Sequence, residues 1–127
     1  MITIMLADDH AVTRMGIKSI IELNSEIRVI YEASNGKEIL KILEKEVLPD
    51  IIIIDIHMPL MNGYESVKVL RKIYPTIKII VFSFITEQDA IINMISQGVS
   101  GYITKSSDPS ILTEAILSVY VNGFYLG

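Results

Sequence analysis

Five short apolar runs alternate along the chain with segments of helical periodicity, and this alternation constrains the fold more than any other feature. The runs, rich in β-branched residues, are Ile2–Leu6, Arg28–Ala33, Ile51–Ile54, Ile77–Phe82 and Gly101–Thr104. The segments with apolar residues at helical spacing are 12–23, 36–46, 64–74, 87–97 and 109–121. Strands that alternate with helices form a parallel sheet covered by helices on both faces. We therefore expect an α/β fold with a doubly wound parallel sheet.

Local signals support these boundaries. The first helix is expected to bury a stripe of Val12, Met15, Ile20 and Leu23. Asn35-Gly36 and Asn62-Gly63 are predicted to open the second and third helices. Pro75 is expected to close the third helix, and Gly98 to follow the fourth. Ser107-Asp108-Pro109 is predicted to place a capping residue before a first-turn proline of the last helix.

Composition narrows the possible functions. A chain of 127 residues, half of them hydrophobic, is the size of one domain with a substantial core. The chain contains no cysteine, which excludes a disulfide, a thiolate zinc site and a cysteine nucleophile and agrees with a cytoplasmic location. The net charge is −4 and the basic residues are scattered, which argues against DNA contact by this segment itself. Its N-terminus does not resemble a signal peptide, and its apolar runs are too short to span a membrane.

The polar residues that end the predicted strands are Asp8 and Asp9, Asp55, Ser83, and Thr104 with Lys105. Open α/β sheets place their ligand sites at the carboxyl ends of the strands. Three carboxylates at one edge repel one another and need a cation, a proton or a phosphoryl partner. Mg²⁺ suits such oxygen ligands. A carboxylate beside the metal could form an aspartyl phosphate, with Lys105 and Ser83 around the phosphoryl oxygens.

Each residue also has a purely structural interpretation. Asp8 or Asp9 could cap the first helix, and Asp55 could be a turn residue. Lys105 could be a solvated loop lysine, and Ser83 could make a local hydrogen bond at its strand end. The functional interpretation is favoured because independent structural roles would not bring all five residues to one edge of the sheet.

Four segments together resemble the receiver domain of two-component response regulators. These segments are Leu6–His10, Asp55–Gly63, Val81–Ser83 and Gly101–Lys105. Asp55–Gly63 carries the pattern D-x-x-M-P-x-M-N-G, which is specific to that family, whereas a single short motif would be weak evidence. The resemblance covers residues 2 to about 122. It implies a flavodoxin-like (βα)5 fold with strand order 2-1-3-4-5.

The resemblance also implies a metal site for Mg²⁺ or Mn²⁺. Asp9 and Asp55 would bind the ion directly, the main-chain carbonyl of His57 would be the third protein ligand, and Asp8 would act mainly through water.

The same resemblance makes Asp55 the phosphoacceptor, which receives its phosphoryl group from a sensor histidine kinase. Ser83 and Lys105 would bind the phosphoryl oxygens, and Tyr102 would turn inward as Ser83 moves toward the phosphate. Such a domain is not a conventional enzyme, because it catalyses only its own phosphorylation and slow dephosphorylation.

The segment Gly101–Ser107 and the C-terminal residues resemble the NarL/FixJ (LuxR-type) subfamily. The resemblance implies a receiver domain over residues 1–122 and a linker starting at 123–127. That linker would lead to a helix-turn-helix domain that this chain lacks. DNA would be bound only through that domain, to regulate transcription, and phosphorylation would favour a homodimer. A free-standing receiver is the alternative.

The chain departs from the family pattern near the site. Ser106 follows Lys105 where proline is frequent, so that bond is expected to be trans. Phe84 is bulky for its position and could narrow access to Asp55. His57 and Ile85 occupy positions that in the family tune loss of the phosphoryl group. We expect Ile85 and Phe84 to shield an acyl phosphate, and His57 to oppose them by orienting water.

Three other classes fit part of the pattern. A haloacid dehalogenase-type enzyme expects a second aspartate where His57 stands, and its nucleophile after the first strand. A flavin-binding module expects a loop rich in Ser, Thr and Gly where Asp8–His10 stands. A receiver-like module without phosphorylation would not need the complete set of Asp8, Asp9, Asp55, Ser83 and Lys105.

Overall fold

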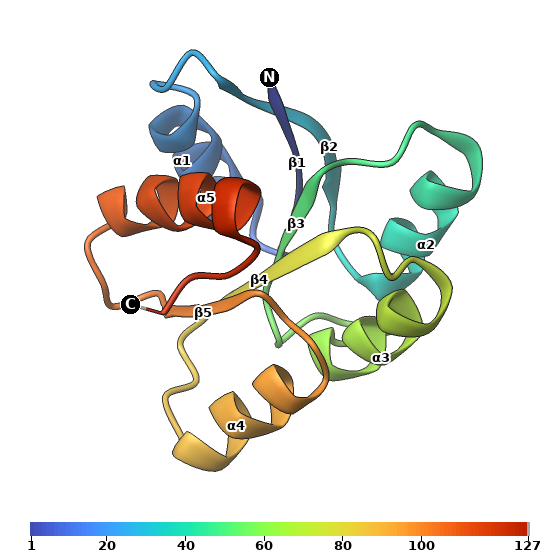
Figure 1. The fold of residues 1–127 in the computed structure, drawn as a ribbon. Coiled ribbons are helices and arrows are strands. Elements are labelled where there is room, and N and C mark those ends of the chain that lie inside the picture. Colours follow the sequence, from blue (N-terminus) through green and yellow to red (C-terminus); the bar gives the residue numbers. More distant parts are fainter. Residues whose placement is uncertain (127) are drawn as a thin grey trace.

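The computed structural model describes residues 1–126, and within them one parallel five-stranded sheet carries five helices (Figure 1). The strand order is β2-β1-β3-β4-β5, which confirms the expected doubly wound fold. The strands are β1 (Ile2–Ala7), β2 (Ile27–Ala33), β3 (Ile51–Ile54), β4 (Lys78–Ser83) and β5 (Gly101–Thr104). The helices are α1 (Ala11–Ile21), α2 (Gly36–Lys45), α3 (Gly63–Ile73), α4 (Gln88–Ser96) and α5 (Ser110–Asn122).

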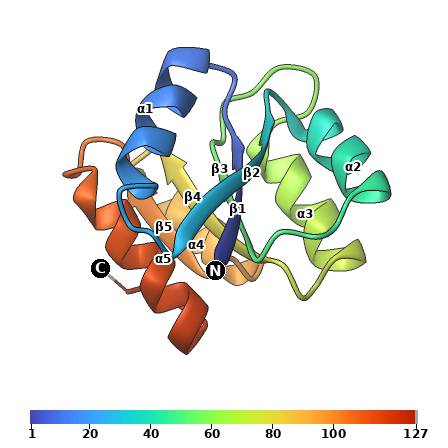
Figure 2. The same ribbon diagram turned by 90° about the horizontal axis from the view of Figure 1, so that it is seen from above.

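The sheet separates two apolar cores. Helices α1 and α5 cover one face, and α2, α3 and α4 cover the other, as the two views in Figures 1 and 2 show. Ile17 of α1 and Ile116 of α5 belong to the first core. Ile39 of α2, Leu70 of α3 and Met94 of α4 belong to the second. Strands buried on both faces need apolar residues throughout, which is why β3 is four consecutive isoleucines.

The register of the central strands brings two acidic residues to one edge. Ala7 of β1 pairs with Ile54 of β3, so both strands end at the same height. The amide of Asp55 then donates to the Ala7 carbonyl at 2.9 Å. Asp8 and Asp55, the next residue of each strand, therefore meet at the carboxyl end of the sheet.

The predicted helix starts after Asn35 and Asn62 are confirmed. The Asn35 side chain accepts from the Glu38 amide, and Asn62 forms a reciprocal capping box with Glu65. Gly98 lies just beyond α4 with φ 98°, as expected of a residue that ends a helix. At α5 the expectation was one residue early, because the helix begins at Ser110 and Pro109 is its N-cap.

The apolar stripe predicted for the first helix was wrong. Ile17 and Ile21 are the buried residues of α1, whereas Val12 and Met15 are 81% and 66% exposed. The helix carries apolar residues on two faces, and periodicity alone does not say which one meets the sheet. Leu23 lies beyond the end of α1 and is exposed for that reason.

The segment after α5 folds back toward the sheet. Gly123 ends the helix in the left-handed region, with φ 91°. The Tyr125 amide then donates to the Ser100 carbonyl at 2.9 Å, beside the start of β5. Of the residues expected to begin a linker, 123–127, Tyr125 thus packs on the domain and Leu126 is exposed. Gly127 lies outside the described residues.

Within residues 1–126, no helix combines the length and the apolar character that a membrane crossing requires.

Gly63 allows α3 to start directly against the Asp55 backbone. A Cβ at this position would lie 2.5 Å from the Asp55 carbonyl oxygen and 2.7 Å from the Cα of Ile56. We predict that Gly63→Ala lowers the free energy of unfolding by about 1–3 kcal/mol, because the inserted methyl forces the backbone to shift. Urea denaturation measures this loss.

Gly16→Ala is the matched control. A Cβ at Gly16 of α1 would meet no other atom within 4 Å. This variant should gain up to about 1 kcal/mol through the better helix propensity of alanine. Equal effects of the two substitutions would contradict the steric explanation.

Candidate functional site

Lys105 joins the two buried acidic residues at the carboxyl end of the sheet. Its Nζ lies 2.6 Å from Asp8 Oδ2 and 3.0 Å from Asp55 Oδ2. The three side chains are 6%, 4% and 7% exposed, respectively. Each residue follows a different strand, and the Lys105 amide donates to the Ser83 carbonyl at the end of β4. The structure thus brings together Asp8, Asp55 and Lys105 as the sequence predicted.

The lysine is held in its charged form. Burial lowers the pKa of Lys105, but the hydrogen bonds and the charges of Asp8 and Asp55 outweigh burial, so its pKa lies above the ordinary value. The ammonium group therefore partly compensates the charge of the carboxylates.

The second oxygen of each buried carboxylate accepts a hydrogen bond from a backbone amide. Asp55 Oδ1 accepts from the Ile56 amide at 2.7 Å, and Asp8 Oδ1 accepts from the His10 amide at 2.9 Å. These hydrogen bonds, together with those from Lys105, fix the orientation of both carboxylates. The Arg14 guanidinium donates to the Asp8 carbonyl and pairs with Glu32 at 3.0 Å, a support that sequence analysis missed.

Asp9 and His10 form the outer part of the site. Asp9 Oδ1 lies 3.1 Å from Nδ1 of His10, and the two side chains are 31% and 70% exposed. One ligand atom from each of Asp8, Asp9 and His10 lies within 4.8 Å of the others. Carboxylate oxygens at an open edge of the sheet are the donors that a hard divalent cation prefers, so the residues present fit Mg²⁺. His57, expected to contribute its carbonyl, is exposed in the loop after Asp55.

Ser83 and Tyr102 are connected through one residue of the β4–α4 loop. The Ser83 hydroxyl, fully buried, accepts from the Ile85 amide at 3.2 Å, and the Tyr102 hydroxyl donates to the Ile85 carbonyl at 2.7 Å. Burial is the main cause that raises the pKa of Tyr102 to about 12, so its phenol is neutral at physiological pH. The two predicted switch residues, Ser83 and Tyr102, therefore both form hydrogen bonds with the backbone of Ile85.

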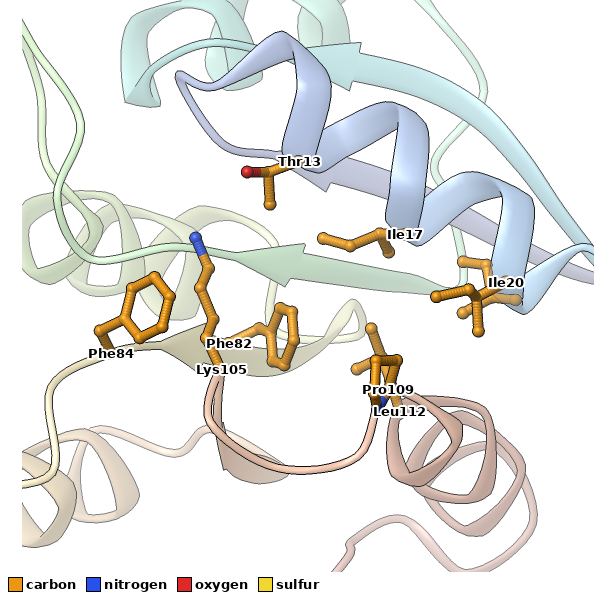
Figure 3. Close-up of a pocket in the computed structure, with 9 residues that line it drawn as sticks. Thr13, Ile17, Ile20, Phe82, Phe84, Lys105, Pro109 and Leu112 are labelled. Atoms are coloured by element: carbon orange, nitrogen blue, oxygen red, sulfur yellow. The ribbon is translucent and has the colours of Figure 1, made fainter.

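Two aromatic rings lie beside Lys105, as Figure 3 shows. Its Nζ is 5.9 Å from the centroid of Phe82 and 5.5 Å from that of Phe84, within the range of cation–π attraction. The bulk of Phe84 predicted a steric effect at this position, but not this contact with Lys105. The signal available was the spacing of Phe82 and Phe84, two residues apart and hence on one side of an extended chain.

The same side chains line a hollow of about 220 Å³ between α1 and α5 (Figure 3). The other lining residues are mainly aliphatic, among them Ile17, Ile20 and Leu112. Because this lining is apolar, the hollow is distinct from the charged site beside it. Lys105 lies at the boundary between the two.

Comparison with known proteins agrees with this geometry. The family model of the response regulator receiver domain matches residues 4–117. The chain is 40% identical to the chemotaxis protein CheY of Thermotoga maritima over 91% of this chain and 95% of that protein. It is 34% identical to the transcriptional regulatory protein DegU of Brevibacillus brevis over 98% of this chain.

A solved structure extends the agreement to three dimensions. The two-component response regulator of the LuxR family from Aurantimonas sp. SI85-9A1 superposes with a TM-score of 0.89 at 33% identity. The match covers 96% of this chain and 86% of that one. The chain spans about half the length of the transcriptional regulators it matches, 52% in the case of DegU.

Loss of the Lys105 charge should make the stability of the protein more dependent on divalent cations. We expect Lys105→Met to lower the free energy of unfolding by about 3 kcal/mol, because buried carboxylates lose their partner. Saturating Mg²⁺ should then raise the melting temperature of the variant more than that of the wild type. Calorimetry with and without Mg²⁺ tests both effects.

Lys72→Met, on the exposed side of α3, is the matched control and should change neither quantity. An equal Mg²⁺ response in wild type and Lys105→Met would show that Lys105 does not compensate the carboxylates.

Proposed function

Because this chain belongs to the response regulator receiver domain family, we propose that it is the phosphorylation-controlled switch of a two-component system. Asp55 is the phosphoacceptor in this proposal. The observation that carries it is the bridge from Lys105 to both Asp55 and Asp8 at the carboxyl end of the sheet. Signalling, and not metabolic catalysis, is the role of this family.

The chemistry is transfer of a phosphoryl group to a carboxylate. An oxygen of Asp55 forms a bond to phosphorus, and the bond from phosphorus to the donor breaks, with the electron pair leaving on the donor. A histidine kinase would supply the group from a phosphorylated histidine, whose nitrogen leaves. Lys105 lies 3.0 Å from Asp55 and would stabilise the charge that the phosphoryl oxygens bring.

A divalent cation, Mg²⁺ or Mn²⁺, completes the proposed site. Asp9, Asp55 and the main-chain carbonyl of His57 would hold it, and Asp8 would contact it mainly through water. The ion supplies positive charge to the phosphoryl oxygens when it is bound. The outward position of Asp9 supports this assignment, because Lys105 already takes the inner oxygens of Asp8 and Asp55.

The proposed response to phosphorylation runs through Ile85. Ser83 would leave the Ile85 amide and donate to a phosphoryl oxygen, because a new dianion attracts a hydroxyl. Tyr102 donates to the Ile85 carbonyl, so displacement of this loop changes the environment of its ring. The altered face of α4 and β5 would then carry the signal onward.

The proposed partners follow from the family and its relatives. A sensor histidine kinase donates the phosphoryl group, and phosphorylation favours a homodimer. DegU is named a transcriptional regulator and is longer than this chain, so regulation of transcription through a separate DNA-binding domain is part of the proposal. A cytoplasmic location is also proposed on the strength of family membership. The family match leaves no support for the dehalogenase or flavin-binding alternatives.

We predict that incubation with acetyl phosphate and Mg²⁺ adds one phosphoryl group to the protein. Intact-mass spectrometry should show a gain of about 80 Da for an acid-labile HPO₃ unit. The gain should require Mg²⁺ and disappear in Asp55→Asn, which keeps the shape of the side chain. A folded wild-type protein that gains no mass would instead favour a receiver-like module without phosphorylation.

Ile85 is predicted to protect the phosphorylated state. Its apolar side chain lies two residues beyond Ser83 and is partly buried in the core under α4, where it would exclude an attacking water. Ile85→Glu should speed dephosphorylation by about tenfold, because a carboxylate can orient water and accept its proton. The decay of the phosphorylated mass after removal of the donor measures the rate.

Ile92→Glu, at an exposed position of α4, is the control of equal charge and should leave the rate unchanged. Equal rates in Ile85→Glu and wild type would exclude shielding by Ile85.

A further inference from the structure

We propose that the imidazole of His10 is a direct ligand of the divalent cation in this site. The proposal rests on the proposed function, because it adds a nitrogen ligand to the oxygen ligands described above. It further implies that borderline ions, such as Co²⁺ and Ni²⁺, gain affinity relative to Mg²⁺. The loop before α1 then helps to determine which metal the protein carries.

The donor atoms of His10 and its acidic neighbours lie at distances suited to one metal ion. Nδ1 of His10 lies 3.1 Å from Asp9 Oδ1 and 3.3 Å from Asp8 Oδ1. Two adjacent ligands of an octahedral ion, each about 2.1 Å from the metal, are about 3.0 Å apart. Nδ1 of His10 therefore lies close to the spacing of a neighbouring ligand from Asp9 Oδ1, the carboxylate oxygen proposed to bind the ion directly.

Backbone hydrogen bonds hold His10 in place. Its amide donates to Asp8 Oδ1 at 2.9 Å, and its carbonyl accepts from the Arg14 amide at 3.0 Å. Arg14 also donates through its guanidinium to the Asp8 carbonyl. The ring is thus presented from a loop that is anchored on both sides, as a ligand must be.

Capping of α1 does not account for the His10 side chain. His10 occupies the N-cap position of α1, but its side chain makes no capping hydrogen bond. Its ring is 70% exposed, and its two close contacts with carboxylates within residues 1–126 are with Asp8 and Asp9. A contact made by so exposed a ring contributes little to stability.

The carboxylate oxygens of Asp8, Asp9 and Asp55 face two different partners, Lys105 on the inside and His10 on the outside. Lys105 takes Asp8 Oδ2 and Asp55 Oδ2 on the inside. Asp8 Oδ1 and Asp9 Oδ1 turn toward His10 on the outside. A metal ion on the outer side would therefore meet the imidazole without displacing the lysine. Imidazole favours Co²⁺ and Ni²⁺ far more than Mg²⁺, which prefers oxygen.

The decisive test is the electron spin echo modulation of Mn²⁺ bound to the untagged protein. A directly bound imidazole nitrogen gives ¹⁴N modulation, and the chain contains only two histidines, His10 and His57. We expect the modulation in the wild type, its retention in His57→Ala and its loss in His10→Ala. His10→Gln, which keeps a polar side chain of similar length, should also lose it and serves if the alanine variant is unstable.

Calorimetric titration provides the second readout. We expect His10→Ala to weaken Ni²⁺ binding at least about tenfold, the loss typical even for partners outside the ligand shell. Mg²⁺ affinity should change less than about twofold, because Mg²⁺ gains little from nitrogen.

Two results would overturn the proposal. Bound Mn²⁺ without ¹⁴N modulation, or modulation lost in His57→Ala and kept in His10→Ala, would exclude His10 as the ligand. The phosphorylation assay with Mg²⁺ on the wild type is independent of both results. Failure of the His10 proposal would therefore be distinguishable from failure of the proposed function, and absence of Mn²⁺ binding would count against both.

Discussion

The contact of the Lys105 ammonium with two buried carboxylates is the interaction on which the rest of the site depends. Asp8 and Asp55 follow neighbouring strands in register, so the sheet itself brings their charges together. Without a cation this arrangement would oppose folding. Lys105 follows β5, at the edge of the same sheet, and reaches across β4 to both acids. One side chain thereby links the ends of β1, β3 and β5.

This contact also makes the two sides of the site different from each other. The inner side holds a buried ammonium with Phe82 and Phe84 beside it, both within the range of cation–π attraction. The outer side presents Asp9 and His10 to solvent. A phosphoryl group on Asp55 would lie between a permanent cation on one side and an exchangeable one on the other. The proposed roles of Lys105 and of the divalent cation therefore have a simple electrostatic basis in this arrangement.

Much of this arrangement was predictable because it depends on strand ends. The isoleucine run of β3 and the acids after β1 and β3 indicated where charge would gather, since parallel strands end on one side. The Asn35 and Asn62 caps were equally predictable, because they depend on residues within four positions. Strand order came from the family resemblance and not from periodicity.

Features set by tertiary packing were harder to predict. The buried face of α1 is chosen by contact with the sheet, and Val12 and Met15 satisfied the same periodicity as Ile17 and Ile21. The rings beside Lys105 and the orientation of His10 depend on loops whose conformation no repeat in the sequence encodes.

Gly63 is a further residue whose role depends on tertiary packing, and its consequence concerns the stiffness of the backbone around Asp55. The Gly63 amide donates to the Ile56 carbonyl at 2.8 Å, and α3 rests on the Asp55 backbone without an intervening side chain. Asp55, the proposed acceptor, is therefore backed directly by the start of α3 on one side, while the Ile85 loop on the other is held to Ser83 and Tyr102 by two hydrogen bonds. Under the proposed function, strain created at Asp55 would be relieved toward that loop, because breaking two hydrogen bonds requires less rearrangement than moving a helix that rests on the Asp55 backbone.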